Sequence, residues 1–443
     1  MALNTPNCHR LCTSTTQVTI MNKLQQIPAA FPRLYDVSDS IKVVEVAKKY
    51  EGPEGAPITR IPEYTIPQGS HEYHCSKVAT SWTQGFFPGL AWLVEERRRL
   101  LPEAVESSYS GKEIMRLARR YQESFKFLAK KAINHDQGFR FQLCYGMDFA
   151  LTGDEEAKRV LVDAADSLVE LYTPQVGCMR SWTMMRKANM PDLWREDNLD
   201  EHYLVIIDNL MNLDMLYEAT ELTGDPKYAQ VATHQAEKSL NSHVRSDYTT
   251  YHVVDFNQDG SVKKCMTHQG YADESAWSRG QSWAIYGYAQ CALRTGRKDF
   301  LETACKLADK FFELLPESGV PWWDFDAPKP CPYDASAGAV TACGLLMLYR
   351  LLRPTDPRTA EQYLTKSFKL VDDLMRECRT GKATLEGDKV IWGEGAWETI
   401  LEHSTINGNE LATKRLLDHG LVYADFYFMQ YGNELLKLRL EAN

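Results

Sequence analysis

The sequence predicts an all-α protein, an (α/α)6 barrel of repeated helical hairpins, and three observations support this fold class. The tripeptide Thr-Gly-Asp/Arg begins at Thr152, Thr223 and Thr295, at nearly equal spacing. Each copy lies between two segments with helical periodicity. The first segment of each pair is apolar nearly all round and the second is amphipathic, so we expect buried inner helices and half-exposed outer helices.

The N-terminal residues lie outside this repeat. Residues 1–75 are polar and rich in proline from Pro53 to Pro67, so we expect an N-terminal extension with one helix near residues 38–49. Beyond it the pattern is helical nearly throughout, beginning with amphipathic helices expected at residues 89–101 and 123–133.

Four hairpin units follow, at residues 139–172, 204–240, 282–315 and, more loosely, 339–375. Gly153, Gly224 and Gly296 each follow the first helix of a unit, at the position where a left-handed residue ends a helix. The pair Asp225-Pro226 suits the cap and first turn of the next helix.

Alternating buried and amphipathic helices fit either an open solenoid or a closed double ring. An open array would expose the apolar inner helices to water, so closure is favoured. Six hairpins of about 60–70 residues need about 360–420 residues, which residues 76–443 nearly supply. We therefore expect an extension at 1–75 and a barrel at 76–443.

Composition narrows the function classes. A net charge of −10 argues against general nucleic-acid binding and against binding to an anionic membrane surface. No apolar run approaches the ~20 residues that span a bilayer, and no signal-peptide pattern is evident. The 11 cysteines are scattered singly, which is typical of reduced thiols. We expect a cytoplasmic protein, monomeric or homodimeric, with no metal and no cofactor.

Two aspartates occupy equivalent positions in successive units. Asp136 lies just ahead of one inner helix, and Asp208 lies in the apolar segment VIIDNLMN at the start of the next. Burial raises the pKa of such a carboxyl, whereas a helix N-terminus and nearby donors lower it. Two carboxyls in one pocket can therefore titrate apart and act as acid and base. A helix cap explains either Asp alone, but the repeated position favours the catalytic interpretation.

The third unit begins with an unusual density of donors and indoles. Residues 267–289 contain His268, Gln269, Asp273, Trp277, Arg279, Gln281 and Trp283. Indole rings stack on the C–H faces of sugars, while Arg and Gln bind carboxylates and hydroxyls. Trp82, Phe86 and Trp194 recur at other expected loop ends. Core packing explains any one of these residues, but the set is typical of a carbohydrate cleft.

One apparent metal motif does not fit. The segment DFNQDG at 255–260 matches the start of a calcium loop, but the twelfth position is Met266 where the loop needs Glu. A turn in a short hairpin explains this segment better.

Four motifs carry a resemblance to a known family: HDQGF at 135–139, IIDNLMN at 206–212, HQGYADESAWSRGQSWAIYG at 268–287 and LVYADFYFMQ at 421–430. Together they resemble the unsaturated glucuronyl hydrolases, glycoside hydrolase family 88, over about residues 76–435. The resemblance implies an (α/α)6-barrel enzyme. It would act on oligosaccharides left by polysaccharide lyases, which carry a 4,5-unsaturated uronic acid at the non-reducing end.

The same resemblance implies the chemistry and the residues. A carboxylic acid protonates C4 of the vinyl ether, water adds at C5, and the resulting hemiketal opens and expels the rest of the sugar. Asp208 matches the general acid/base and Asp136 its partner carboxylate. The expected substrate contacts are Trp82, Phe86, His135, Trp194, His252, His268, Gln269, Arg279 and Trp283.

Other functions stay open at this point. A rhamnogalacturonyl relative would use the same chemistry on pectin fragments, and a non-catalytic barrel would bind acidic glycans without turnover. An epimerase on this barrel would be expected to use pairs of His in place of the two Asp. The N-terminal extension and the loop at 326–338 depart from the family, so linkage and sulfation preferences are not fixed.

Overall fold

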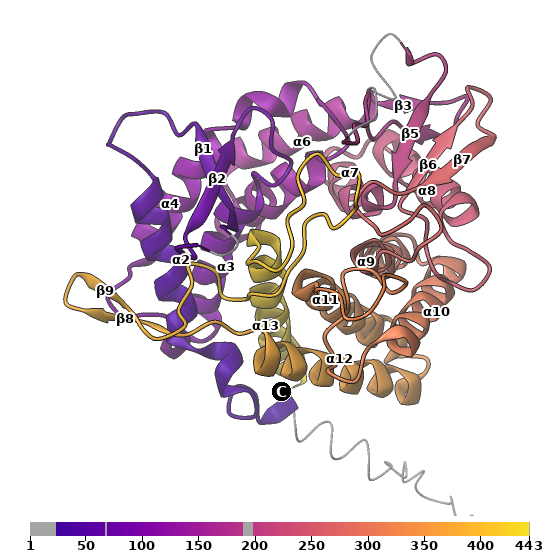
Figure 1. Cartoon of the computed structure of the whole chain (residues 1–443). Coiled ribbons are helices and arrows are strands. Elements are labelled where there is room, and N and C mark those ends of the chain that lie inside the picture. Colours follow the sequence, from indigo (N-terminus) through magenta and orange to yellow (C-terminus); the bar gives the residue numbers. More distant parts are fainter. Residues whose placement is uncertain (1–23, 67–68, 189–197, 443) are drawn as a thin grey trace, which may run out of the picture.

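A closed ring of inner helices forms the centre of the molecule (Figure 1). The computed structural model describes residues 24–66, 69–188 and 198–442. The ring consists of α3 (Phe86–Leu100), the π-helical segment η4 (Gly138–Gly146) with α5 (Met147–Thr152), the 3₁₀ segment η6 (Ile207–Asn212) with α7 (Leu213–Thr223), α9 (Ser278–Thr295), α11 (Ala335–Leu352) and α13 (Val422–Ala442). Each member contacts the next, and α13 contacts both α11 and α3, so the ring is closed.

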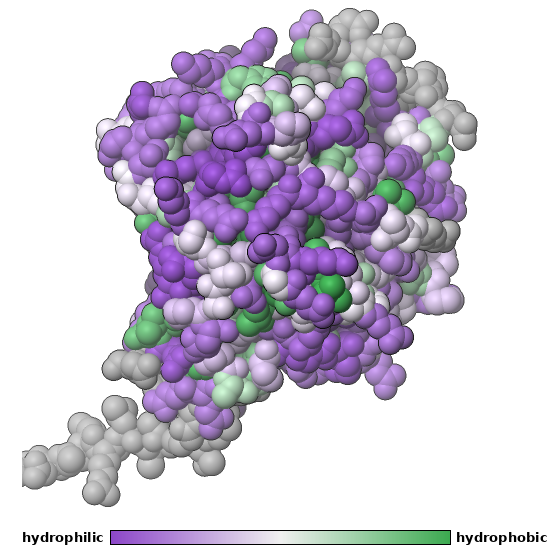
Figure 2. Space-filling model, turned by 90° about the vertical axis from the view of Figure 1, so that its left-hand side faces the viewer, coloured by the Kyte–Doolittle hydropathy of each residue, from purple (hydrophilic) through white to green (hydrophobic). Residues whose placement is uncertain are grey.

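An outer layer of amphipathic helices covers this ring. It consists of α2 (Val37–Tyr50), α4 (Gly111–Glu123), α6 (Glu155–Val169), α8 (Lys227–Ser242), α10 (Lys298–Leu314) and α12 (Pro357–Glu377). Each outer helix packs on at least one member of the inner ring. The arrangement confirms the (α/α)6 barrel. The face in Figure 2 is mainly hydrophilic, with hydrophobic residues only in small groups, as amphipathic outer helices require.

The described part of the expected N-terminal extension packs onto the barrel. Helix α2 contacts α3 and α4, and the Asp39 carboxylate lies 3.8 Å from the Arg97 guanidinium of α3. Both side chains are fully buried. Helix α2 therefore takes the outer position that completes the double ring, and a boundary at residue 75 cuts through packed structure.

The glycine turns have the expected conformation. Gly153, Gly224 and Gly296 have φ values of +71°, +76° and +68°, so each ends its helix in the left-handed region. The Asp225 side chain accepts a hydrogen bond from the backbone N–H of Lys227 (2.9 Å). These turns lie at the ends of α5, α7 and α9, one helix length from the residues that begin the inner helices.

The prediction of an amphipathic helix at residues 123–133 is wrong. Helix α4 ends at Glu123, and only the short 3₁₀ turn η3 (Lys126–Lys130) follows. The side chain of Ser110 begins α4 by accepting from the backbone N–H of Glu113, so the helix starts earlier than the pattern suggested. The apolar spacing in 123–133 has another cause, because Phe125 and Leu128 reach the core from an irregular turn.

The described residues also form four small antiparallel sheets outside the helices of the ring. They are β1 (Arg60–Thr65) with β2 (Tyr73–Lys77), β3 (Tyr172–Thr173) with β4 (Cys178–Met179), β5 (Tyr203–Ile206) with β6 (Val253–Phe256) and β7 (Val262–Met266), and β8 (Ala383–Glu386) with β9 (Lys389–Trp392). The three-stranded sheet matters most, because residues at its strand ends enter the site described below. Residues 257–261 connect β6 to β7, which confirms the expected hairpin turn. The described residues also include the two 3₁₀ turns η1 (Pro32–Tyr35) and η2 (Pro102–Ala104).

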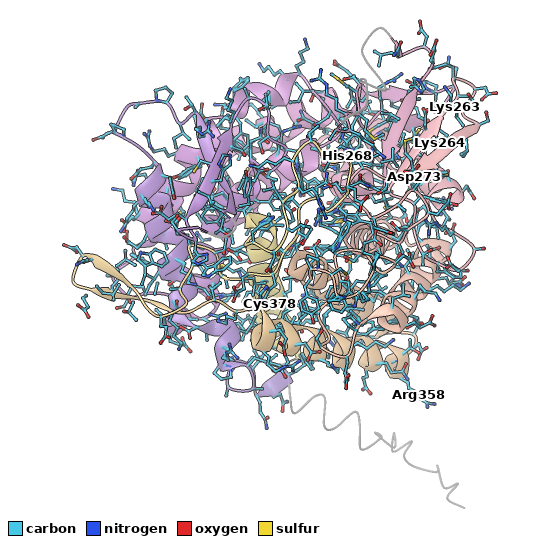
Figure 3. All side chains as sticks on the ribbon, viewed as in Figure 1. Lys263, Lys264, His268, Asp273, Arg358 and Cys378 are labelled. Atoms are coloured by element: carbon cyan, nitrogen blue, oxygen red, sulfur yellow. The ribbon has the colours of Figure 1, made fainter. Side chains whose placement is uncertain are left out.

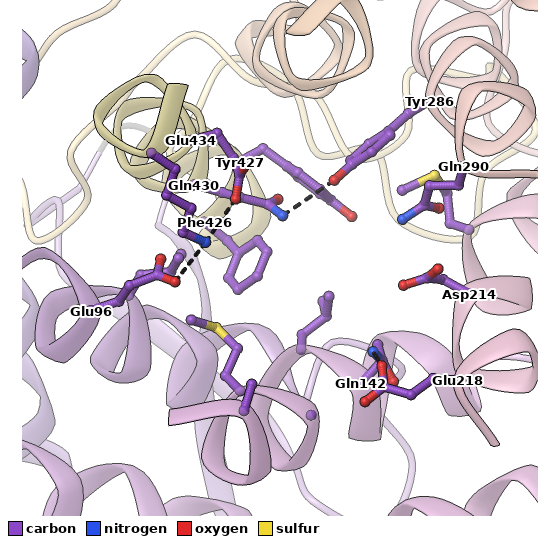
Figure 4. A pocket seen from close by; sticks show the side chains of 17 residues that line it. Glu96, Gln142, Asp214, Glu218, Tyr286, Gln290, Phe426, Tyr427, Gln430 and Glu434 are labelled. Carbon is purple, nitrogen blue, oxygen red and sulfur yellow. Dashed lines mark hydrogen bonds and ion pairs between the residues drawn. The ribbon is translucent and has the colours of Figure 1, made fainter. Parts of the chain in front are cut away.

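A cavity of about 340 Å³ lies inside the ring toward the helix C-terminal ends (Figure 4). Its lining mixes apolar and polar side chains, and the carboxylates Asp214 and Glu96 there have cationic partners. Asp214 pairs with Arg294 (2.7 Å), and Glu96 pairs with Lys437 (2.7 Å). The residues predicted for catalysis lie at the opposite ends of the same helices.

Among the described residues, α11 is the one helix whose length and composition match a membrane span, and most of that helix is buried inside the protein. Its apolar character follows from its place in the inner ring, where nearly every residue is buried.

Candidate active site

The two predicted carboxylates lie where neighbouring inner helices begin. Asp136 precedes η4, and Asp208 is the second residue of η6. The backbone N–H of Phe139 donates to Asn212 Oδ1 (2.9 Å), which ties the two segments together. Gly138 permits this approach, because a Cβ there would lie 2.6 Å from Asn212 Cα. The first turns of η4 and η6 therefore place both aspartates on the same side of the ring.

Burial sets the titration of Asp208. Asp208 is 6% exposed, and its Oδ1 has no hydrogen-bond partner among the described residues. Loss of hydration raises the pKa of Asp208 to about 6, and the charge of Asp136 adds to this rise, against the opposing effects of His135 and Arg279. A carboxyl with this pKa can hold a proton near neutral pH and release it to a substrate.

Two histidines flank the carboxylates. His135 Nε2 lies 3.2 Å from Asp136 Oδ1, and His252 Nε2 lies 3.9 Å from Asp208 Oδ1. His252 sits just before β6 and is 2% exposed. Burial moves the pKa of His252 well below its usual value, so this imidazole is neutral. The histidines expected as substrate contacts are thus brought together with the two aspartates.

The segment after β7 closes one side of the site. The backbone N–H groups of His268 and Gln269 donate to His252 Nδ1, and the Gln269 side-chain amide donates to the Ile406 carbonyl (2.9 Å). Burial lowers the pKa of His268 to about 4, so it is neutral. Figure 3 places His268 nearer the centre of the ring than Lys263 and Lys264, which lie out on strand β7. The structure thus brings His268 and Gln269 into contact with His252, and their role as substrate contacts stays a prediction.

Arg279 has a different environment from the one expected of a substrate contact. Its Nη1 forms an ion pair with Asp334 and donates to the Thr405 carbonyl (2.6 Å), and its Nη2 donates to the Ile406 carbonyl (2.7 Å). The side chain is 1% exposed. These contacts join α9 to the start of α11 and to the 405–406 loop, so Arg279 shapes the site wall.

The aromatic residues form one packed group. Trp82 contacts Phe139 with ring centroids 5.3 Å apart, and Phe139 contacts Trp283 at 5.1 Å. Phe86 and Trp283 are fully buried, whereas Trp82 is partly exposed. Trp82 is therefore the member of this group that can meet a ligand, and the others support it. Trp194 lies outside the described residues.

Two further residues, which no sequence pattern singled out, organise the site. Arg140 is fully buried and donates to Gln84 Oε1 (3.1 Å) and to Asn134 Oδ1 (2.7 Å), which fixes the loops that carry Trp82 and Asp136. The Arg279 guanidinium carbon lies over the ring of Tyr423 in α13, 5.4 Å from the centroid of that ring. The arginine in HDQGFR offered a signal for the first, but nothing in the closing-helix motif singled out Tyr423.

Among the described residues no group of three or more His, Cys, Asp or Glu side chains is arranged to hold a metal ion. The side chains of the site that can transfer protons include its carboxylates and imidazoles. A closed helical double ring that gathers two carboxylates, donors and aromatic rings at one end defines a glycoside hydrolase of the (α/α)6-barrel class.

Known proteins place the chain within this class. It is 37% identical over 299 residues to the unsaturated glucuronyl hydrolase of Bacillus sp., covering 66% of this chain and 73% of that protein. It is 33% identical over 356 residues to the unsaturated glucuronyl hydrolase of Formosa agariphila, covering 79% and 78%. The crystal structure of the Bacillus sp. GL1 enzyme, responsible for the degradation of glycosaminoglycan, superposes with a TM-score of 0.72 at 29% identity over 91% of this chain and 95% of that chain. No protein-family model matches. The chain belongs to the unsaturated glucuronyl hydrolases.

The contacts of Arg279 generate a prediction about stability. We expect Arg279→Met to lower the free energy of unfolding by about 3–5 kcal/mol, because Asp334 would remain as a buried charge without its partner. The double variant Arg279→Met/Asp334→Asn should recover part of this loss. Urea unfolding of the two variants and the wild type measures the difference. A fully stable Arg279→Met that has lost only substrate affinity would show that Arg279 is a substrate contact and not a structural cation.

Proposed function

We propose that the protein releases the 4,5-unsaturated uronic acid from the non-reducing end of glycosaminoglycan oligosaccharides produced by a lyase. The observation that carries this proposal is the buried pair Asp136 and Asp208, with the raised pKa of Asp208. Family membership supports the substrate class, because the related Bacillus sp. GL1 enzyme is described as responsible for the degradation of glycosaminoglycan.

Asp208 acts as the general acid and then as the base. Its carboxyl proton moves to C4 of the C4=C5 bond, which leaves a cation at C5 stabilised by the ring oxygen. Water adds at C5, and the carboxylate of Asp208 takes the proton that this water gives up. The C5 hemiketal opens to a ketone and leaves the former ring oxygen as a hydroxyl on C1. This C1 hemiacetal then collapses to an aldehyde, and its hydroxyl proton leaves with the remaining sugar as an alcohol. The anomeric carbon is never attacked directly, so the usual carboxylate separation rule for glycosidases does not apply.

The surrounding groups serve this reaction in distinct ways. Asp136 stays close enough to raise the pKa of Asp208, which keeps a proton available. The imidazole of His252, held 3.9 Å from Asp208, and the side chain of Gln269 offer donors to the acidic sugar. Trp82 offers a partly exposed indole face on which a sugar ring can stack.

A reducing compartment such as the cytoplasm, and a monomeric or homodimeric state, are parts of the same proposal. Each cysteine among the described residues is a free thiol, which supports the first part. The net charge of −10 supports a partner set limited to the acidic oligosaccharide substrate, without nucleic acid or membrane.

The substrate class is tested by following the ultraviolet absorbance of the conjugated C4=C5 bond. Unsaturated chondroitin or hyaluronan disaccharides should lose this absorbance during turnover. Unsaturated galacturonyl-rhamnose should react at least about 10-fold more slowly, a difference of about 1.4 kcal/mol in transition-state binding. Faster turnover of the rhamnose disaccharide would move the protein to the pectin-directed relatives. Binding without any loss of absorbance would identify a glycan-binding barrel.

The role of Asp208 is tested by substitution. We expect Asp208→Asn to reduce kcat by about 10²–10⁴-fold, because the amide cannot donate or accept the catalytic proton. Asp214→Asn is the matched control, since Asp214 follows on the same inner helix but pairs with Arg294 at the other end. Near-wild-type kcat in a folded Asp208→Asn protein would remove Asp208 from the mechanism.

The raised pKa of Asp208 predicts a pH dependence. The free enzyme needs the protonated carboxyl, so kcat/KM should be constant below the folded pKa of about 6 and should fall about tenfold per pH unit above it. Steady-state rates across the pH range at fixed ionic strength give this limb. A profile that stays flat from about pH 5 to about pH 8 would contradict the general-acid assignment.

A further inference from the structure

A buried serine contacts the histidine beside Asp136. Ser181 is fully buried and is held in place by its backbone N–H, which donates to the Leu204 carbonyl (2.7 Å). Its Oγ accepts from the backbone N–H of Ile206 (3.0 Å) and lies 3.3 Å from His135 Nδ1. Strand β5, which carries Leu204 and Ile206, leads directly into Asp208, so this serine sits on the framework of the active site.

The donor and acceptor count at Ser181 selects one tautomer of His135. The hydroxyl oxygen already accepts from Ile206, and His135 Nδ1 is the one acceptor that its hydrogen reaches among the described residues. If Nδ1 carried the imidazole hydrogen, the serine hydrogen would be buried without an acceptor, which costs free energy. The serine therefore donates to Nδ1, and the imidazole hydrogen resides on Nε2.

The second histidine reaches the same tautomer by a different route. His252 Nδ1 accepts from the backbone N–H groups of His268 (3.2 Å) and Gln269 (3.4 Å). Its hydrogen must therefore be on Nε2. The Nε2 atoms of His135 and His252 are both buried without a hydrogen-bond partner among the described residues, and both lie beside the catalytic carboxylates.

We propose that Ser181 is a positioning residue that holds His135 as an Nε2–H donor to the bound uronate, as the backbone amides at 268 and 269 do for His252. Two Nε2–H groups then face one acidic sugar beside the carboxylate pair. The substrate carboxylate and hydroxyl oxygens are the acceptors that such donors recognise. This inference rests on the proposed function for its substrate, but not for the tautomer itself.

The tautomer is measured first in the wild-type protein. Long-range proton–nitrogen NMR spectra of ¹⁵N-histidine-labelled protein distinguish the protonated ring nitrogen from the bare one, and His135→Gln assigns the signal. We expect hydrogen on Nε2 of His135. Hydrogen on Nδ1 would overturn the proposal whether or not any variant folds.

Substitution of the serine then tests its role. We expect Ser181→Ala to release the ring to a mixture of tautomers and to lower kcat/KM by about 10-fold or more, the size of a lost buried hydrogen bond. Ser181→Thr keeps the hydroxyl and should keep both the spectrum and the rate. The control is Ser367→Ala, which removes an equally buried hydroxyl with two partners, the Leu364 carbonyl (2.8 Å) and the Tyr431 hydroxyl (3.1 Å), on outer helix α12.

An unchanged His135 spectrum together with an unchanged kcat/KM in Ser181→Ala would overturn the proposal. An equal loss of rate in Ser181→Ala and Ser367→Ala would also overturn it, since the effect would then be general destabilisation. If the wild type turned over no unsaturated uronide, the proposed function would fail, while the ring spectrum would still decide the role of Ser181.

Discussion

Closure of the inner ring is the constraint on which the rest of this structure depends. Helices such as α9 and α11 are apolar on nearly every side and are buried along almost their whole length, so each needs neighbours all round. Helix α13 provides the last contact by packing on both α11 and α3. Once the ring is closed, polar groups can meet a ligand only at its two ends. At one end, carboxylates that form ion pairs line a cavity. At the other end, Asp208 Oδ1 and the Nε2 atoms of His135 and His252 are buried without a hydrogen-bond partner among the described residues.

Buried arginines hold the loops at the catalytic end in fixed positions through hydrogen bonds. Arg140 donates to residues before α3 and before η4, and Arg279 joins α9 to Asp334 and the 405–406 loop. A guanidinium spreads several donors in one plane, so a single buried side chain can hold several segments. The cost is desolvation, which lowers the pKa of Arg140 to about 10 while leaving it charged. Loops held in this way can keep His135, Asp136 and Gln269 in place before substrate arrives.

The sequence allowed prediction of the barrel, its repeated turns and both carboxylates, because each has a local signal: helical periodicity, a left-handed glycine, or an equivalent position in successive units. It did not allow prediction of contacts between distant segments. Residues 1–75 lie outside the hairpin repeat, so the pattern gives no sign that α2 packs beside α3 and α4, where it buries Ile41, Val44 and Asp39. Residue type alone also did not reveal the surroundings of Arg279, where Asp334 and two carbonyls accept from three of its five N–H donors; its role as a substrate contact stays a prediction.

The two aspartates show why environment, and not residue type, separates their roles. Both come from equivalent starts of inner helices, yet the contacts around them differ. His135 Nε2 lies 3.2 Å from Asp136 Oδ1, and Asp136 raises the pKa of the nearby Arg140 guanidinium against the larger effect of burial. Asp208 Oδ1 has no hydrogen-bond partner among the described residues, and burial outweighs the attraction of Arg279. Burial therefore makes Asp208 the carboxyl that can hold a proton near neutral pH, although both aspartates occupy equivalent positions in successive units.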